Sequence, residues 1–462
     1  MSFIHTILGI SAFPSDLKNL SLKYCSLQVV VSGIYLSYAW ISLYYLSILD
    51  SFIAFGIILS IGMFCGAILD LPLGILTDRL GQRLAFCGAL SCLFVYYLGL
   101  IFAVKPIELL FLEIIVGIYS ALLSGSFNVW FMNTWELFSS KGNELSFRSV
   151  MGSVNFVKTI VAALAAFLGG CLLHLNQVKP QTIFLIQAMI AVIGVFLGLK
   201  FISSPPSMKR RILRKEEKIN SISQIYSHNT SGINRKIQYI KEKYIYVAPF
   251  FVGFSLLAFT SVSFSTVVFS SLLYDISSPI QIFNQDNYNI QFATISIILV
   301  SITRAISEIV FAFASRLSGK ISSFINSPYK GLLIFYTLNY PVGWIAYLCI
   351  VGINFSPFLK LILVIFIFFL RIILIGLTTG LYWQVYLNIT SSETRSSQES
   401  LFNTINLFLS IIGYGLLGAT LEFFSFTGAL IFLLVISCLG ILILILVNEP
   451  QKNSGASQKL VL

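Results

Sequence analysis

Apolar runs long enough to cross a membrane recur along the whole chain of 462 residues. A membrane-spanning helix needs about 20 apolar residues to cross roughly 30 Å of hydrocarbon, and twelve runs approach that length. Lipid offers no partner for free backbone N–H and C=O groups, so each run is expected to form a helix. Only 10% of the residues are charged, against roughly 25% in soluble domains. The sequence therefore predicts an all-α integral membrane protein with twelve transmembrane helices.

The twelve runs fall into two sets of six, separated by the one long polar stretch of the chain. Their approximate bounds are 24–46, 51–76, 84–104, 107–133, 148–174, 181–202, 245–272, 290–314, 331–352, 361–387, 401–423 and 427–447. We expect two pseudo-symmetric six-helix bundles, formed by residues 1–202 and 245–448. Residues 203–244 are then a basic linker, and residues 449–462 a tail.

Lysines and arginines are distributed unevenly over the predicted loops. Twelve spans put both termini on one side, and that side receives 23 of the 29 basic residues, whereas the opposite loops carry Lys105, Lys179 and Lys360. Cytoplasmic loops are enriched in lysine and arginine. We therefore expect a multi-pass protein of the cytoplasmic (plasma or inner) membrane, with both termini and the linker in the cytoplasm. This bias accounts for the net charge of +11, and no nucleic-acid partner is expected.

Short motifs at equivalent places indicate that the two halves are related. The fourth span reads SGSFNVWFMNTW and the tenth TGLYWQVYLNIT, which share a glycine and an asparagine at the same spacing. The loop DRLGQR after the second span corresponds to SRLSGK after the eighth, which aligns Arg79 with Arg316. Transporters with a central site are often built from such repeats. The matches favour the pseudo-symmetric arrangement.

The loop after the second span combines charges, glycines and a proline in the stretch DLPLGILTDRLGQR. It resembles the loop signature of the major facilitator superfamily, in which a glycine precedes Asp-Arg, a second glycine and a basic residue. The matching positions are Gly74, Asp78, Arg79, Gly81 and Arg83. A narrower subgroup has Glu, an aliphatic residue, Pro, Thr and Gly before this loop. Here Asp70 replaces the usual glutamate and Leu73 the usual threonine.

The resemblance implies a transporter whose two bundles expose a central site to each side of the membrane in turn. In the family, the equivalents of Asp78 and Arg83 form a cytoplasmic contact between the loop and neighbouring helices, and this contact breaks and reforms during the cycle. We expect gating roles for the motif residues, for Asp70, and for Arg316 and Arg395 of the second half. The alternative is that the loop only makes a turn and sets orientation, since arginines suit a helix C-terminus beside an anionic leaflet.

The fourth and tenth spans depart from the subgroup. Where the subgroup carries two acidic residues, this chain has Asn128 and Asn133, and neutral amides cannot take up and release protons. In the tenth span the polar residues are Gln384 and Asn388, and Arg395 follows in an Arg-Ser-Ser segment that resembles the family's Arg-Ala-Thr. We expect these four amides to be candidates for substrate binding.

Five further charged residues lie inside predicted spans, where each costs about 2.5–3.5 kcal/mol on insertion scales. They are Glu113, Lys158, Arg304, Glu308 and Arg371, and all are candidates for substrate binding or ion coupling. Arg304 and Glu308 are four apart, hence on one helical face, and the alternative is that they only neutralise each other. Lys158 and Arg371 would either neutralise an anionic substrate or pair with acids. Five aromatic residues of the spans would line a cavity or simply pack, namely Trp40, Trp130, Trp383, Tyr38 and Tyr382.

These observations predict a secondary active transporter that moves a small molecule by alternating access, in the direction of efflux of an amphipathic compound or metabolite. Uptake of a nutrient or chelate, and a transporter-like sensor, are the alternatives. A membrane enzyme is not expected, because the histidines and buried acids are dispersed instead of clustered. Since no phosphate-binding loop is present, we expect an ion gradient, with the proton as the candidate ion, or the substrate's own gradient as the energy source. We expect no cofactor, no metal and a monomer.

Overall fold

The computed structural model describes residues 13–124, 126–127, 130–131, 134–135, 144–174, 178–202, 248–277, 294–325, 327–389 and 395–447, and these residues are helical with no strand. The first half contains α2 (Ser15–Gly33), η1 (Ile34–Ser37), α3 (Ile41–Leu49), α4 (Phe52–Leu80), α5 (Gln82–Phe102), α6 (Pro106–Ser124), α8 (Glu144–His174) and α9 (Pro180–Phe201). The second half contains an apolar helix Ala248–Ser263, η2 (Phe264–Val268), α12 (Phe269–Ser277), α13 (Thr294–Phe324), α14 (Pro328–Thr337), η4 (Leu338–Val342), α15 (Gly343–Gly352), α16 (Pro357–Ile389) and α17 (Arg395–Leu446). The predicted linker 203–244 and tail 449–462 lie outside the described residues.

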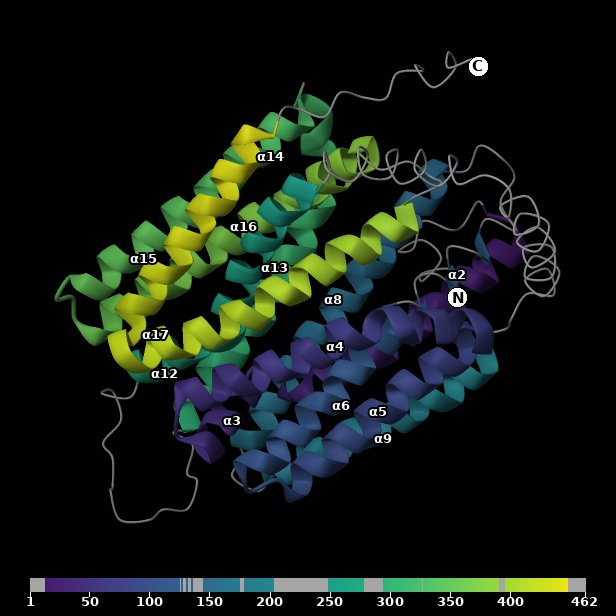
Figure 1. Ribbon diagram of the computed structural model, residues 1–462, viewed down its shortest axis with the longest axis horizontal. Coiled ribbons are helices and arrows are strands. Elements are labelled where there is room, and N and C mark those ends of the chain that lie inside the picture. The colour runs from purple at the N-terminus through teal and green to yellow at the C-terminus, as the bar shows by residue number, and fades with distance from the viewer. Residues whose placement is uncertain are drawn as a thin grey trace, which may run out of the picture.

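Eight of the described helices are long and apolar enough to cross a membrane, and a ninth span results if a bent pair is counted as one. The bent pair is Ser15–Ser37 with Ile41–Leu49, which meet at 41°. In α17, which has 52 residues, Ser425 has φ 60° and ψ −167° and interrupts the helix. The predicted eleventh and twelfth spans are therefore the two arms of α17, one on each side of Ser425 (Figure 1).

Two helices of the first half extend beyond the predicted spans. The first helix begins at Ser15, well before the apolar run, because Leu17 and Leu20 are buried in the core and continue the helix toward the N-terminus. The helix α4 continues to Leu80, so Asp70 lies about 15 Å from its C-terminal end at 1.5 Å per residue. Asp70 is thus deeper in its helix than the sequence indicated.

Gly81 forms the sharp turn between α4 and α5. Its φ of 91° is in the region that favours glycine, and its N–H donates to the Thr77 carbonyl at 2.8 Å. Because a side chain at this position would be strained, the turn explains why the loop motif requires this glycine.

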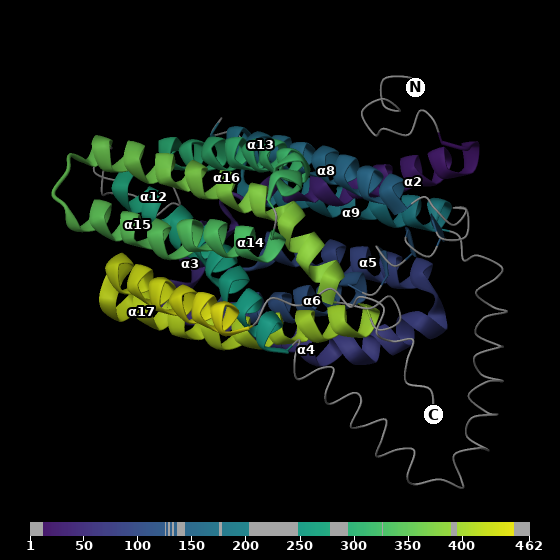
Figure 2. The same ribbon diagram turned by 90° about the horizontal axis from the view of Figure 1, so that it is seen from above.

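The helices of the first half pack against one another, as do the helices of the second half, and the two groups lie side by side (Figure 1). Two antiparallel seams join the groups, one between α4 and α17 and the other between α8 and α13. Figure 2 shows these seams on opposite sides of the molecule. The break in the first helix, between η1 and α3, lies in the region between them.

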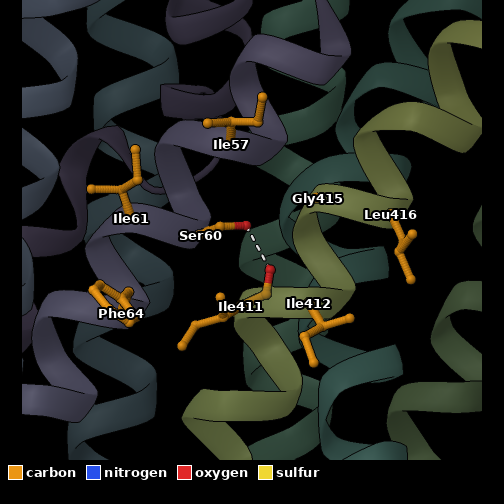
Figure 3. Close-up of a pocket in the computed structure, with 8 residues that line it drawn as sticks. All are labelled: Ile57, Ser60, Ile61, Phe64, Ile411, Ile412, Gly415 and Leu416. Atoms are coloured by element: carbon orange, nitrogen blue, oxygen red, sulfur yellow. Dashed lines mark hydrogen bonds between the residues drawn. The ribbon is translucent and has the colours of Figure 1, made fainter.

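The α4–α17 seam is held by backbone groups as well as side chains. The Phe52 N–H donates to Glu422 Oε2 at 2.8 Å, and the Ser60 hydroxyl donates to the Ile411 carbonyl at 2.7 Å (Figure 3). Because the partners of later residues in α4 come from earlier residues in α17, the two helices run antiparallel along the whole seam.

Two glycines bring the α4 and α17 backbones together. A Cβ added at Gly56 would clash with the Tyr414 carbonyl oxygen, and one added at Gly418 would clash with the Phe52 carbonyl oxygen. Glycines allow helices to approach this closely in membrane proteins. The seam therefore tolerates no side chain at Gly56 or Gly418.

An apolar groove of about 410 Å³ lies along the outer side of this seam (Figure 3). It is lined by Ile57, Ser60, Ile61, Phe64, Ile411, Ile412, Gly415 and Leu416. Several of these side chains are exposed, including Ile57 at 48% and Ile412 at 61%. Such exposed aliphatic side chains on a membrane-spanning helix suit contact with lipid, and the charged candidates lie elsewhere.

Candidate functional site

The break in the first helix brings the first half into contact with the second. Residues 38–40 form a turn between η1 and α3, and two of them reach across the interface. Arg304 Nη2 of α13 donates to the Tyr38 hydroxyl, and the Ser270 hydroxyl of α12 donates to the Ala39 carbonyl at 3.5 Å. The break therefore presents a side-chain hydroxyl and a backbone carbonyl between the halves, and an unbroken helix would use that carbonyl in its own hydrogen bonds.

Arg304 is the best-connected charged residue at this interface. It is only 8% exposed, and its guanidinium carbon lies 4.4 Å from the centroid of the Tyr38 ring. Nη2 also forms an ion pair with Glu308 Oε1 at 3.5 Å, which is the pairing that their spacing predicts. Nε, which is buried, has no acceptor among the described residues. A buried arginine usually needs further acceptors, so this N–H is available to a ligand.

Lys158 adds a second cation to the same region. It lies on α8, which packs against α13, and it is half-buried and within electrostatic range of the Glu308 carboxylate. Arg304 thus pairs with the Glu308 carboxylate, and Lys158 lies close enough to feel its charge. The group formed by Tyr38, Lys158, Arg304 and Glu308 is called the seam cluster below. Its charges sum to an excess of one positive charge, which favours an anionic ligand.

Two of the gating candidates contact the opposite half. The Asn403 side-chain amide of α17 donates to Asp70 Oδ2 of α4 at 3.4 Å. On the other seam, the Arg316 guanidinium of α13 lies 5.5 Å from the centroid of the Phe156 ring of α8. Asp70 and Arg316 therefore lie at seams that an alternating-access cycle would have to open.

For most of the remaining motif residues the structure describes the position of the backbone alone. Gly74 lies within α4 and Gly81 at its end, and Arg83 is exposed near the start of α5. Asp78 and Arg79 lie in the last turns of α4, but their side chains are outside the described part of the structure. The contact of Asp78 and Arg83 with neighbouring helices stays a prediction.

Glu113 is buried inside the first half instead of between the halves. Its Oε1 accepts a hydrogen bond of 2.8 Å from the Tyr45 hydroxyl, which in turn lies 2.9 Å from the Tyr96 hydroxyl. Its Oε2 lies against Gly62, where an added Cβ would be 2.7 Å away. These partners come from α3, α5 and α4, so Glu113 ties four elements of the first half together.

Removing the Tyr45 hydroxyl, which donates a hydrogen bond to Glu113, should destabilise the first half. We expect Tyr45→Phe to lower the free energy of unfolding by about 1–3 kcal/mol, the cost of leaving a buried polar group without its partner. The measurement is the thermal midpoint of the purified protein in detergent. Ser91→Ala, which removes a partly buried hydroxyl bonded only within its own helix, is the control. A midpoint unchanged in Tyr45→Phe would show that the carboxyl group does not need this donor.

Arg371 is also placed inside one half. Its Nε donates to the Asn339 carbonyl at 3.0 Å, and its guanidinium carbon lies 3.6 Å from the centroid of the Trp344 ring. Both partners belong to the second half, so Arg371 does not share the seam cluster.

The other candidates cannot be placed. Asn128 and Asn133 lie outside the described residues, as do the side chains of Gln384, Asn388 and Arg395. Their roles stay predictions. Among the residues that the structure describes, no group of histidine, cysteine, aspartate or glutamate is arranged to hold a metal ion.

Sequence reasoning missed several residues that make these contacts. Asn403 and Ser270 reach across the interface, and Asn339 binds Arg371. The available signal was an amide inside an apolar run, which marks Asn403 and Asn339 as costly in lipid. Ser270 gives no such signal, because serines bond readily to the backbone of their own helix.

Comparisons with known proteins agree with this architecture. The family model described as Major Facilitator Superfamily matches residues 25–414. The fold is similar to that of a mutant form of the nucleoside transporter NupG, with a TM-score of 0.65 and 14% identity over 93% of this chain and 100% of that chain. It is similar to a D-xylose–proton symporter, with a TM-score of 0.63 and 10% identity over 94% of this chain and 98% of that chain.

A POT family transporter in complex with 5-aminolevulinic acid is also similar, with a TM-score of 0.62 and 14% identity over 95% of this chain and 97% of that chain. At these identities the likeness shows the fold alone. A search of curated protein sequences found no match. The family model covers most of the chain, and eight of the described helices are long and apolar enough to span a membrane, as in a multi-pass membrane transporter. The chain therefore belongs to the major facilitator superfamily.

Proposed function

We propose that this chain is a secondary active transporter of the cytoplasmic membrane that exports small amphipathic molecules bearing an anionic group. The observation that carries the proposal is the seam cluster, in which Lys158 and Arg304 outnumber Glu308 between the two halves. A carboxylate or phosphate group matches the planar fork of an arginine. The apolar part of the substrate would lie against the aromatic rings beside it.

The cluster suits a ligand that is both charged and aromatic or aliphatic. The Tyr35 and Tyr38 rings meet edge to face with centroids 5.1 Å apart, so they form one apolar wall beside the Arg304 guanidinium. An anionic group of the substrate would take the free Arg304 Nε and compete with Glu308 for Nη2. Binding would thus weaken a contact that holds α13 in its present position.

Alternating access would open one end of the seams at a time. On the proposed topology, Phe52 and Glu422 mark the outer end of the α4–α17 seam, whereas Asp70 and Asn403 lie nearer the cytoplasm. Opening to the cytoplasm would break the inner contact and keep the outer one, and opening outward would do the reverse. The loop motif around Asp78 would act as a latch at the inner end.

The proposed topology has twelve spans in two six-helix bundles, with both termini in the cytoplasm. Ten of the spans follow if the bent pair counts as one span and the two arms of α17 count as two. The other two are the helix Ala248–Ser263 with η2 and α12, and the helix α13. The bias of basic residues toward one set of loops supports this orientation. The chain would act as a monomer.

The energy source is proposed to be an ion gradient, with the proton as the ion. Glu308 and Glu113 are the carboxyl groups that could carry it, one in the seam cluster and one inside the first half. Efflux is favoured by the resemblance of the loop motif to a subgroup of efflux carriers. Uptake, and ligand sensing without transport, are the alternatives that an experiment must separate.

A dye assay in intact cells tests direction and charge preference together. Cells that express the protein should lose preloaded carboxyfluorescein, an anionic amphipath, faster than cells with an empty vector, and should lose the cationic dye ethidium at the control rate. A protonophore should abolish the difference. Faster accumulation of carboxyfluorescein would indicate uptake, and no change for either dye would contradict the proposed substrate class.

Lys158→Gln should weaken the binding of anionic substrates selectively. Loss of one charge-assisted hydrogen bond is expected to raise KM about tenfold, with kcat within about twofold of the wild type. The measurement is the concentration dependence of carboxyfluorescein efflux. Lys105→Gln, a substitution in an exposed loop at the start of α6, is the control. Unchanged kinetics in Lys158→Gln would remove Lys158 from the site.

A further inference from the structure

The interior of the second half holds a cation among uncharged partners. Arg371 is 4% exposed, and its guanidinium carbon lies 3.6 Å from the centroid of the Trp344 ring and 5.1 Å from that of Phe264. Its Nε donates to the backbone and side-chain oxygens of Asn339, at 3.0 and 3.3 Å. These contacts orient the guanidinium but bring no negative charge to it.

No carboxylate neutralises this arginine among the residues that the structure describes, where the one ion pair joins Arg304 and Glu308. Burying a charge is costly unless it is paired, and aromatic faces offset only part of that cost. By its position near the middle of α16, Arg371 is also far from either end of its helix. The guanidinium therefore needs a negative partner that the described chain does not supply.

Hydrogen-bond donors without acceptors surround the same guanidinium. Asn339 Nδ2, Trp344 Nε1 and the Tyr347 hydroxyl are buried, and none has a hydrogen bond of normal geometry within the described structure. Asn339 is bonded to Arg371, and the Trp344 and Tyr347 rings lie 3.6 and 5.7 Å from its guanidinium carbon. Three unused donors next to one unpaired cation form a group that lacks an acceptor.

Two π-helical segments meet at this arginine. Phe264 begins η2 and Asn339 lies in η4, which also contains Pro341. Single π turns inside α-helices occur often at functional sites, because they displace backbone and side chains from regular positions. The contact of both π turns with Arg371 is an observation independent of the unused donors. It indicates that both helices depart from regular geometry where they contact this arginine.

We propose that the second half binds a small monovalent anion, such as chloride, between Arg371, Asn339 and Trp344, with the Tyr347 hydroxyl completing the site. The anion accepts from the donors that lack partners and neutralises the guanidinium. A monatomic anion suits a site enclosed by aromatic side chains, four of which lie within 6 Å of the guanidinium carbon. The site lies within one half, is distinct from the seam cluster, and does not depend on the proposed direction or substrate of transport.

The test is the thermal midpoint of the purified full-length protein in detergent, with sodium chloride replacing sodium gluconate at constant ionic strength. The wild type should show a saturable rise of the midpoint with chloride, because a ligand that binds only the folded state stabilises it. Arg371→Gln should lose this rise. Trp344→Phe keeps an aromatic ring and removes the N–H, and should raise the half-saturating chloride concentration about tenfold.

Trp40→Phe is the matched control. Trp40 also has a buried N–H without an acceptor in the described structure, but it packs against Phe184 instead of a guanidinium, and its variant should keep the wild-type chloride response. If Arg371→Gln does not fold, the half-saturating chloride concentration of Trp344→Phe alone tests the proposed site. The proposal is overturned if chloride and gluconate give the same midpoint in the wild type, or if Trp344→Phe shows the wild-type half-saturating concentration.

Discussion

Arg304→Gln is expected to lower the rate of substrate efflux at least about 100-fold. The substitution removes the ion pair with Glu308 and the hydrogen bond to Tyr38, and it leaves the Glu308 carboxylate with Lys158 alone in the seam cluster. The guanidinium is also the group that would hold the substrate's anion, and truncating one partner of a hydrogen-bonded charge pair costs about 2–5 kcal/mol of binding, where about 2.8 kcal/mol corresponds to 100-fold. The measurement is dye efflux from intact cells, normalised to the amount of protein in the membrane.

A double variant separates a functional role of the pair from mere neutralisation. In Arg304→Gln combined with Glu308→Gln, both charges of the pair are removed, so the folding penalty of the single variant should be relieved. We expect the thermal midpoint to recover and efflux to stay low, because the substrate has lost its guanidinium partner. Recovery of efflux together with stability would show that Arg304 and Glu308 only cancel each other.

Gly418→Leu is expected to reduce transport at least about tenfold by a purely steric route. A Cβ at Gly418 would clash with the Phe52 carbonyl oxygen and lie 3.3 Å from the Gly56 Cα, so α4 and α17 would have to separate. Overpacking of this kind typically costs about 1–3 kcal/mol. The cost falls on the state in which this seam is closed, so the variant should favour the state in which it is open.

Gly415→Leu is the matched control, because it lies on the same helix one turn away. A Cβ at Gly415 would meet only the Ser60 hydroxyl oxygen, at 3.8 Å, and it would point toward the apolar groove (Figure 3). We expect efflux within about twofold of the wild type. Equal loss of efflux in both variants would mean that the α4–α17 seam is sensitive to any added side chain, and not to the closeness of its two backbones.

The sequence predicted the membrane-spanning character of the helices and the pairing of Arg304 with Glu308 because both follow from local rules. Apolar length determines whether a helix can span, and a spacing of four residues places two side chains on one face. The break at Ser425 lies between the predicted eleventh and twelfth spans for the same reason, since a span cannot exceed the thickness of the membrane by much.

Contacts between helices were beyond prediction, because they depend on how each helix is rotated about its axis. Lys158 and Arg371 looked equivalent in sequence, each a lone cation in an apolar run. The structure places Lys158 beside Glu308 at a seam, whereas Arg371 faces Trp344 inside the second half. Similarly, Pro341 marks η4 as an irregular part of its helix, but a proline alone does not specify a π turn.

Gradient-driven flux by the purified protein in proteoliposomes tests the central claim most directly. The anionic dye that cells export should move across the liposome membrane when a proton gradient is imposed, and the movement should stop when an ionophore collapses the gradient. Arg304→Gln in the same liposomes should give only background flux. Binding of the dye without movement, or flux of equal size in wild type and Arg304→Gln, would contradict a transport mechanism that operates through the seam cluster.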